Sequence, residues 1–252
     1  MKTVKISFVI ITWNGLHYVC NLLKSMKNII TREDVEVILV DNGSEDGTAS
    51  YIRRAYPSVI LIELPSNKGV AYARNRGMEV TQGEYIVILD NDVIMKDEVF
   101  HGVFSYMEQH PQVGLASCQL YYEDGSIQES CKKFPGFFYK LGNLLHLHRG
   151  YSYAVEMRGE PFEPVYVIGA FQWVRREAFL QAGFLDENIF YGPEDCDFCL
   201  RIRKAGWQII YLPNYSLLHY CQRMTNHHPF SKMGLHHIWG LFYLYWKYKR
   251  LN

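Results

Sequence analysis

Acidic side chains stand at two places where a buried strand is expected to end. Asp41 closes the apolar run VEVILVD, and Asp90-Asn91-Asp92 closes EYIVILD. In an open α/β sheet, ligands bind beyond the carboxyl ends of the strands, so these carboxylates are expected to share one edge. Hard divalent cations prefer carboxylate oxygens, and Asp-x-Asp on one turn offers two of them. The pattern favours a cation that binds phosphates, although a solvated turn with an Asx cap has the same composition.

A second carboxylate pair, Glu194 and Asp195, opens a helix expected over about 194–205. Only one of two adjacent side chains can easily point into a cleft, where it could take a proton from a substrate hydroxyl. The helix dipole also favours carboxylates in a first turn, so simple capping is the competing interpretation.

The elements that must position these groups alternate between apolar β-branched runs and amphipathic stretches. This alternation predicts βαβ units and a mainly parallel sheet of the doubly wound, nucleotide-binding type. Asn14 is expected to cap the first helix. The strands are predicted at 5–12, 35–41, 59–64, 84–90 and 113–122, and the helices at 15–28, 48–56, 70–81 and 96–109.

The second half is less regular. Residues 123–163 lack clear periodicity and are predicted to be a long functional insertion, because their aromatic side chains need somewhere to bury. Regular structure is expected again at 165–179 and in a strand at 208–212, which a short loop separates from His219. Residues 233–250 predict a last helix that is apolar over most of its circumference.

The zero net charge hides an asymmetry. Residues 201–252 contain eight Lys/Arg and no Asp or Glu, so they carry +8 and residues 1–200 carry −8. Such a basic, aromatic tail indicates an anionic partner, either a lipid surface or a phosphate-bearing substrate. The cations are scattered among hydrophobic residues without a nucleic-acid module, so nucleic-acid binding is not expected. No stretch is long enough to span a bilayer, and the opening residues are predicted to form a strand rather than a signal peptide.

The six cysteines have no disulfide-framework spacing, which favours reduced thiols in a cytosolic compartment. Cys196 and Cys199 form a CxxC, but a second pair is missing. Buried helix packing is therefore favoured over a zinc or redox site.

Six segments in order carry a family resemblance. Together they resemble the family 2 glycosyltransferases of the GT-A fold over about residues 4–220, which implies a three-layer α/β/α architecture. The KKFPGFF segment at 132–138 and LLHY at 217–220 are most similar to bacterial rhamnosyltransferase-like members. The six segments are VIITWNG (9–15), VDNGSEDGT (40–48), NKGVAYARNRG (67–77), LDND (89–92), GAFQWVRREAF (169–179) and YGPEDCDFCLRIRKAGW (191–207).

The resemblance implies a donor site for a nucleoside-diphosphate sugar. Asp41 would accept the N–H of the pyrimidine base beside Thr12, Asp90 would lie near the ribose, and Asp92 would hold Mg²⁺ or Mn²⁺ on the diphosphate. His219 matches a metal ligand of some relatives, although a lone histidine between apolar residues is often a satisfied core residue. The remaining expected donor contacts are Asn14, Asp46, Asn67 and Arg74, with Gly169 and Ala170 letting the backbone approach the sugar.

Two of these residues have other interpretations. Asp46 could cap the next helix, and Arg74 could be a surface residue. For the chemistry, the resemblance matches Asp195 to the catalytic base, and Glu194 to acceptor binding or to orientation of that base. One base opposite the leaving group implies inversion at the anomeric carbon.

The last helix is too short and too basic to span a membrane. As an interfacial helix it would place Trp239, Phe242 and Trp246 at the headgroups and Lys247, Lys249 and Arg250 on anionic lipid. A dimer contact or a contact within the domain is the competing interpretation.

These observations predict an inverting, metal-dependent glycosyltransferase. It would use dTDP-rhamnose or a UDP-sugar and a glycan or lipid-linked acceptor in cell-surface polysaccharide or lipopolysaccharide synthesis, at the cytoplasmic face of the membrane. We expect one GT-A domain at 1–222, with a nucleotide-sugar half (1–122) and an acceptor half (123–222), and a basic extension at 223–252. A nucleotidyltransferase and a non-catalytic nucleotide-sugar-binding protein are the alternatives.

Overall fold

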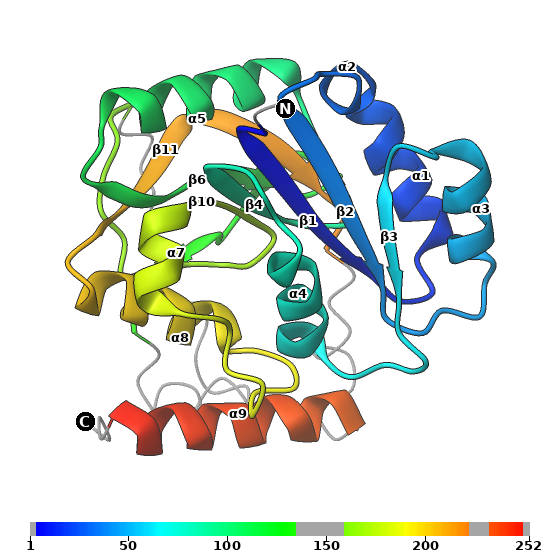
Figure 1. The fold of residues 1–252 in the computed structure, drawn as a ribbon. Helices are drawn as coiled ribbons and strands as arrows, with labels where there is room; N and C mark the ends of the chain where they lie inside the picture. Colours follow the sequence, from blue (N-terminus) through cyan, green and yellow to red (C-terminus); the bar gives the residue numbers. More distant parts are fainter. Residues whose placement is uncertain (1–3, 135–158, 222–231, 249–252) are drawn as a thin grey trace.

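The computed structural model describes residues 4–134, 159–221 and 232–248. Its centre is a nine-stranded sheet in the order β3-β2-β1-β4-β10-β6-β11-β5, with β7 paired to β6 (Figure 1). The strands expected at 5–12, 35–41, 59–64, 84–90 and 113–122 are present, and each of their ends lies within one residue of the expectation. The strands are β1 (Ile6–Thr12), β2 (Val35–Asp41), β3 (Ile60–Glu63), β4 (Tyr85–Asp90), β5 (Val93–Ile94), β6 (Val113–Tyr121), β7 (Ile127–Gln128), β10 (Phe171–Arg175) and β11 (Gln208–His219).

Helices cover both faces of the sheet, which confirms the three-layer GT-A-type architecture. Phe8 and Ile10 of β1 face one core with α1, α3 and α5, whereas Val9 faces a second core with α4, α7 and α8. This alternation follows from the two-residue repeat of a strand buried on both sides. The helices are α1 (Leu16–Ser25), α2 (Lys27–Ile30), α3 (Thr48–Ala55), α4 (Val70–Glu79), α5 (Asp97–Gln109), α7 (Arg176–Ala182), α8 (Glu194–Lys204) and α9 (Lys232–Tyr248).

The sheet is mainly parallel, as predicted. β3, β2, β1 and β4 pair in parallel, and so do β6 and β11. Strands β10, β5 and β7 run the other way. Antiparallel β10 joins the two parallel parts, so the carboxyl ends of β1, β4 and β11 meet at one edge (Figure 1).

Two local predictions were wrong. Asn14 does not cap α1: its backbone has a φ of 49°, and its Oδ1 accepts the N–H of Glu45. The free N–H at the start of α1 is satisfied by Asp46 instead. Strand β11 also does not end at 212. It resumes pairing with β6 after a register shift and reaches His219, so His219 lies in the strand and pairs with Val93.

Cysteine packing follows the sequence interpretation. None of the six cysteines forms a disulfide, and Cys196 and Cys199 are fully buried in α8. Burial raises the pKa of Cys199 to about 12, so this thiol stays protonated and acts as a small apolar side chain.

Helix α9 is attached to the domain by charge. Lys247 pairs with Asp186 and Asp197, each at 2.7 Å, and Asp197 is fully buried. The expectation that Lys247 faces lipid was therefore wrong, because its ammonium neutralises two carboxylates inside the molecule. Lys249 and Arg250 lie outside the described residues.

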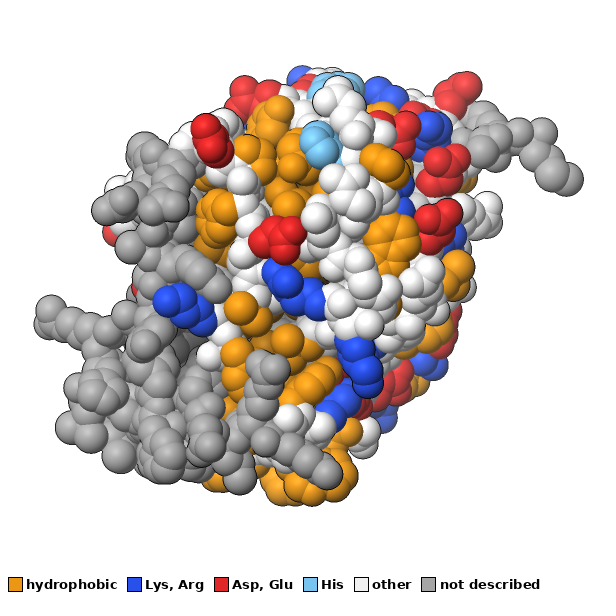
Figure 2. Space-filling model, turned by 90° about the vertical axis from the view of Figure 1, so that its left-hand side faces the viewer, with side chains coloured by type: hydrophobic (Ala, Val, Ile, Leu, Met, Phe, Trp, Pro, Cys, Tyr) orange, Lys and Arg blue, Asp and Glu red, His pale blue; other side chains and the backbone are white. Residues whose placement is uncertain are grey.

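The outward face of α9 is apolar. Trp239, Phe242 and Trp246 are exposed by 63%, 51% and 75%, together with Leu235. Hydrophobic side chains gather at the lower edge of the face in Figure 2, the level at which Figure 1 places α9. Among the described residues, no helix combines the length and apolarity that crossing a bilayer requires.

Candidate active site

Three potential metal ligands meet where β4 and β11 end and β5 begins. One ligand atom from each of Asp90, Asp92 and His219 lies within 4.8 Å of the others. His219 Nε2 is 3.1 Å from Asp92 Oδ1, and His219 Nδ1 donates to Gln128 Oε1 at 2.7 Å. Burial acts to lower the pKa of His219, but the hydrogen bond and charge of Asp92 outweigh it and raise the pKa.

This cluster fits a divalent cation. Two carboxylates and an imidazole are a suitable ligand set, and the side-chain Oε1 of Gln128, accepting from Nδ1–H, would favour the tautomer that leaves Nε2 for a metal. Gln128 comes from β7, inside the stretch for which the sequence showed no periodicity. Only the pairing of β7 with β6 brings it here.

Arg74 joins the cluster to the start of α8. Its guanidinium donates to Asp90 Oδ1 at 2.6 Å, to Glu194 Oε1 at 3.1 Å and to the Gly169 carbonyl at 2.9 Å. Burial lowers the pKa of Arg74, yet the charges of Asp90 and Glu194 raise it overall. The interpretation of Arg74 as a surface residue was wrong, because only 4% of it is exposed. It is placed to position both carboxylates.

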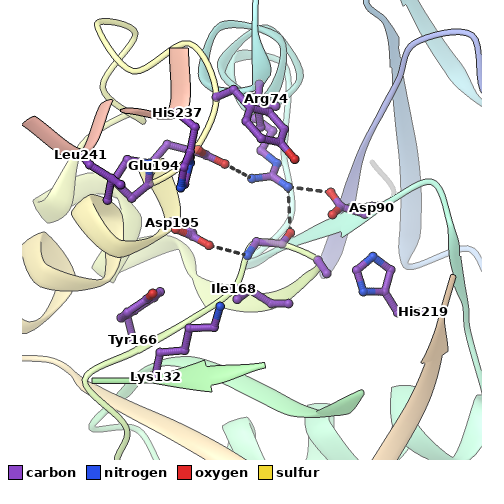
Figure 3. A pocket seen from close by; sticks show the side chains of 16 residues that line it. Arg74, Asp90, Lys132, Tyr166, Ile168, Glu194, Asp195, His219, His237 and Leu241 are labelled. Carbon is purple, nitrogen blue, oxygen red and sulfur yellow. Dashed lines mark hydrogen bonds and ion pairs between the residues drawn. The ribbon is translucent and has the colours of Figure 1, made fainter. Parts of the chain in front are cut away.

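Glu194 and Asp195 occupy the first turn of α8 and face one cavity (Figure 3). Asp195 Oδ2 accepts the Gly169 N–H at 3.3 Å, and Oδ1 accepts the Cys196 N–H at 2.7 Å. Glu194 Oε2 is buried without a partner. Burial, followed by repulsion from Asp195, raises the pKa of Glu194 to about 7.

Gly169 and Ala170 form the loop between β9 (Tyr166–Val167) and β10. A Cβ atom on Gly169 would lie 2.4 Å from Arg74 Nη1, so glycine is required for the guanidinium to pass. The Ala170 carbonyl accepts the Asp90 N–H at 3.0 Å and fixes the end of β4.

The residues expected to bind the nucleotide divide into two groups. Thr12 and Asn67 line a cavity together with Asp90, Asp92 and His219. Asp41, Asp46 and Asn14 do not line it and instead hold the adjoining loop through backbone N–H groups. Asp46 accepts hydrogen bonds from Leu16 and Thr48, the first residues of α1 and α3, and so caps both helices. Burial acts to raise the pKa of Asp46, but these hydrogen bonds lower it overall.

Two neighbouring cavities thus form the site. The β1 cavity is the one lined by Thr12, Asn67 and Asp92. The α8 cavity contains Arg74, Glu194 and Asp195, and Asp90 and His219 line both. Carboxylates from distant parts of the chain therefore share one cleft. Further lining residues were not predicted from the sequence, because only the packing of β8, β9, α9 and the loops brings them to these cavities: Asn42, Lys132, Tyr166, Tyr191, His237 and Leu241.

Comparison with known proteins decides the family. Residues 7–182 match the description of glycosyl transferase family 2. The chain belongs to this family. It is a glycosyltransferase, and neither the nucleotidyltransferase nor the non-catalytic alternative is favoured.

Its relatives include rhamnosyltransferases. N-acetylglucosaminyl-diphospho-decaprenol L-rhamnosyltransferase of Mycobacterium tuberculosis is 29% identical over 228 residues, covering 83% of this chain and 74% of the relative. Rhamnosyltransferase WbbL of Escherichia coli K12 is 26% identical over 185 residues, covering 70% and 67%. The glycosyltransferase therefore resembles rhamnosyltransferase-like members of the family.

Solved structures share the fold. The mannosyltransferase PcManGT of Pyrobaculum calidifontis, in complex with GDP-Man and Mn²⁺, superposes with a TM-score of 0.64 at 22% identity over 88% of this chain. S. aureus TarS in complex with UDP gives 0.66 at 17% identity over 85%. The chain spans 59% and 60% of the lengths of these two chains. At such identities the likeness establishes the GT-A fold alone.

Proposed function

We propose that this glycosyltransferase moves a sugar, with inversion, from a nucleoside-diphosphate sugar to an acceptor hydroxyl in cell-surface polysaccharide synthesis. One observation carries the proposal. A carboxylate suited to act as base, Asp195, and a cation-binding cluster around Asp92 flank one cleft from its two cavities. The rhamnosyltransferase relatives favour dTDP-rhamnose as donor, with a UDP-sugar as the second candidate.

The donor is proposed to occupy the β1 cavity. Thr12 and Asn67 lie there beside Asp92, and the loop built by Asp41 and Asp46 borders it. Asp90, Asp92 and His219 would hold Mg²⁺ or Mn²⁺, which neutralises charge on the departing diphosphate when bound. The protein in complex with GDP-Man and Mn²⁺ makes Mn²⁺ a reasonable first choice.

The acceptor is proposed to enter the α8 cavity. Asp195 Oδ2 would take the proton of the acceptor hydroxyl as its oxygen forms a bond to the anomeric carbon and the bond to the diphosphate oxygen breaks. Arg74 holds Glu194 beside this base and Asp90 beside the donor, so one buried cation sets the spacing between the two reacting partners. Gly169 and Ala170, which line the α8 cavity, would let the backbone approach the transferred sugar.

We further propose that residues 1–222 form the catalytic domain, with donor and acceptor halves at 1–122 and 123–222. In the extension 223–252, the outward face of α9 would rest on the cytoplasmic surface of an anionic membrane. Trp239, Phe242 and Trp246 supply an aromatic face without an acidic residue, and residues 222–252 contain five Lys/Arg and no Asp or Glu. This placement would bring a lipid-linked glycan acceptor to the α8 cavity.

The proposed activity is tested with a sugar-transfer assay. The purified chain is incubated with Mn²⁺, with dTDP-rhamnose, UDP-sugars or GDP-sugars, and with a short-chain lipid-diphosphate N-acetylglucosamine. Acceptor-dependent release of one nucleoside diphosphate, with the opposite anomeric configuration in the product, is expected. Release of pyrophosphate would support a nucleotidyltransferase instead. Binding of a donor without turnover would support a non-catalytic protein.

The membrane contact is tested separately by vesicle sedimentation. The wild type is expected to sediment with phosphatidylglycerol vesicles and not with neutral ones, and Trp239→Ser with Trp246→Ser should abolish this. If the wild type does not sediment with phosphatidylglycerol vesicles, the proposed membrane contact is wrong. A concentration-dependent homodimer that the double variant dissociates would show that the same face binds a second copy.

A further inference from the structure

Lys132 is a cation inside the α8 cavity that the mechanism above does not use. It belongs to β8 (Cys131–Lys132), which pairs with β9 so that Lys132 lies opposite Tyr166. Its side chain is half-buried and lines the cavity together with Asp195. Figure 3 shows it extending from β8 toward the side of the cavity that carries Asp195.

The ammonium of Lys132 is unpaired within the described part of the chain. Neither a hydrogen bond nor an ion pair to a described group involves it. The other strong cation of the cavity, Arg74, is paired with Asp90 and Glu194. Because an ammonium has three donors and no acceptor, its half-burial favours a ligand that brings negative charge.

The position of Lys132 separates it from the proposed donor diphosphate. Lys132 lines only the α8 cavity, whereas Asp92 lines only the β1 cavity. Its neighbours in the wall include Tyr166 and, from α9, Leu241. These are apolar or aromatic surfaces suited to a sugar or a hydrocarbon, so the charged group of such a ligand would find its counter-ion at Lys132.

We propose that Lys132 binds a phosphate group of the acceptor and so selects phosphate-linked acceptors over neutral glycans. This inference rests on the proposed function, because it assumes that the acceptor enters beside Asp195. Lysine binds phosphate as a compact point charge, which suits either a lipid-linked diphosphate or a free sugar phosphate. One relative is named for an N-acetylglucosaminyl-diphospho lipid, so the lipid-linked diphosphate and the free sugar phosphate are both tested below.

The test measures binding rather than turnover, so it stays informative if transfer fails. N-acetylglucosamine 1-phosphate is titrated by calorimetry into the full chain saturated with Mn²⁺ and the nucleoside diphosphate that binds best. Losing one hydrogen bond to a charged group costs about 1.5–3 kcal/mol, so Lys132→Met should weaken this binding about 10- to 100-fold. The affinity for the nucleoside diphosphate should not change, and Lys132→Arg should retain most phosphate affinity.

Lys133→Met is the matched control, because it removes the same charge from the next, exposed residue. It should leave phosphate binding at the wild-type level. Equal weakening by both variants, no weakening by Lys132→Met, or a wild type that does not bind the sugar phosphate would each overturn the proposal. A loss of nucleoside diphosphate affinity in Lys132→Met would assign the lysine to the donor and overturn it as well.

A second ligand separates the two sources of phosphate. If a short-chain lipid diphosphate bearing N-acetylglucosamine binds more tightly than the sugar phosphate, and both lose affinity in Lys132→Met, the acceptor is lipid-linked. If the two ligands bind with equal affinity and both depend on Lys132, the acceptor is a free sugar phosphate. If the transfer assay fails while Lys132-dependent binding persists, the proposed function is wrong but the phosphate site stands.

Discussion

Replacing Gly169 by alanine should disable the site by displacing one buried guanidinium. The new Cβ would lie 2.4 Å from Arg74 Nη1, whereas ordinary contact begins at 3.4 Å. Gly169 is not among the glycines with positive φ, so the backbone itself tolerates alanine. The guanidinium must therefore move by about 1 Å, because side chain and backbone atoms in a close-packed interior leave no other relief.

The size of the effect follows from what the guanidinium holds. Lengthening the 2.6 Å bond to Asp90 by about 1 Å takes it beyond hydrogen-bonding distance. A hydrogen bond between charged groups is worth about 1.5–3 kcal/mol. At about 2–4 °C per kcal/mol for a chain of this size, the Tm should fall by about 3–12 °C. Misplacing Asp90 and Glu194 by a similar distance should lower transfer about 100-fold.

The assay pairs differential scanning fluorimetry with nucleoside diphosphate release. Gly159→Ala is the matched control, since among the described residues its Cβ would meet only Asn214 Oδ1, at 3.5 Å. The control should match the wild type in both measurements. If Gly169→Ala kept the wild-type Tm and transfer rate, Arg74 would not be the link between the two carboxylates, and the account of the site would fail.

Four further outcomes are expected. Asp195→Asn should reduce transfer by about 10²- to 10⁴-fold while nucleoside diphosphate affinity, measured by calorimetry, stays unchanged; normal transfer would remove Asp195 as the base. Asp92→Ala should abolish the Mn²⁺-dependent part of nucleoside diphosphate binding, and unchanged binding would place the cation elsewhere. Lys247→Met should lower the free energy of unfolding in urea by about 3 kcal/mol because two carboxylates lose their cation, whereas the exposed Lys96→Met should change it by less than about 0.5 kcal/mol. Burial acts to raise the pKa of Asp186, but the hydrogen bond from Lys247 outweighs it and lowers this pKa from 3.8 to about 2. The carboxylate therefore stabilises the fold above pH 4, and its contribution is lost as the pH falls toward 2. The stability difference between wild type and Asp186→Asn, followed by urea denaturation from pH 6 downward, should be constant at first and then shrink; a difference that grows on acidification would contradict this.

Much of the fold could be predicted because strand signals are local. The residues just before Asp41 and Asp90 (37–40 and 85–89) are continuously apolar and buried, as in strands covered on both faces, and both strands were found where expected. The family motifs fixed the order of these elements. Asp92 and Asp195 could be proposed from their positions after a strand and at a helix start, since those positions are themselves local features.

Only the tertiary structure decided which charges meet. The sequence around Arg74 is that of an exposed helix, and it is the crossing of α4, the β9–β10 loop and α8 that buries the guanidinium between Asp90 and Glu194. Lys247 likewise has the local pattern of a lipid-facing cation, yet its partners lie more than 45 residues away. Side chain pairing depends on distances across the folded chain, and the strength of a buried ion pair depends on solvent that neighbouring elements exclude. The amino-acid sequence therefore determined the sheet and the positions of its acidic ends, whereas the packing of α8 and α9 determined which of those acids are free to act.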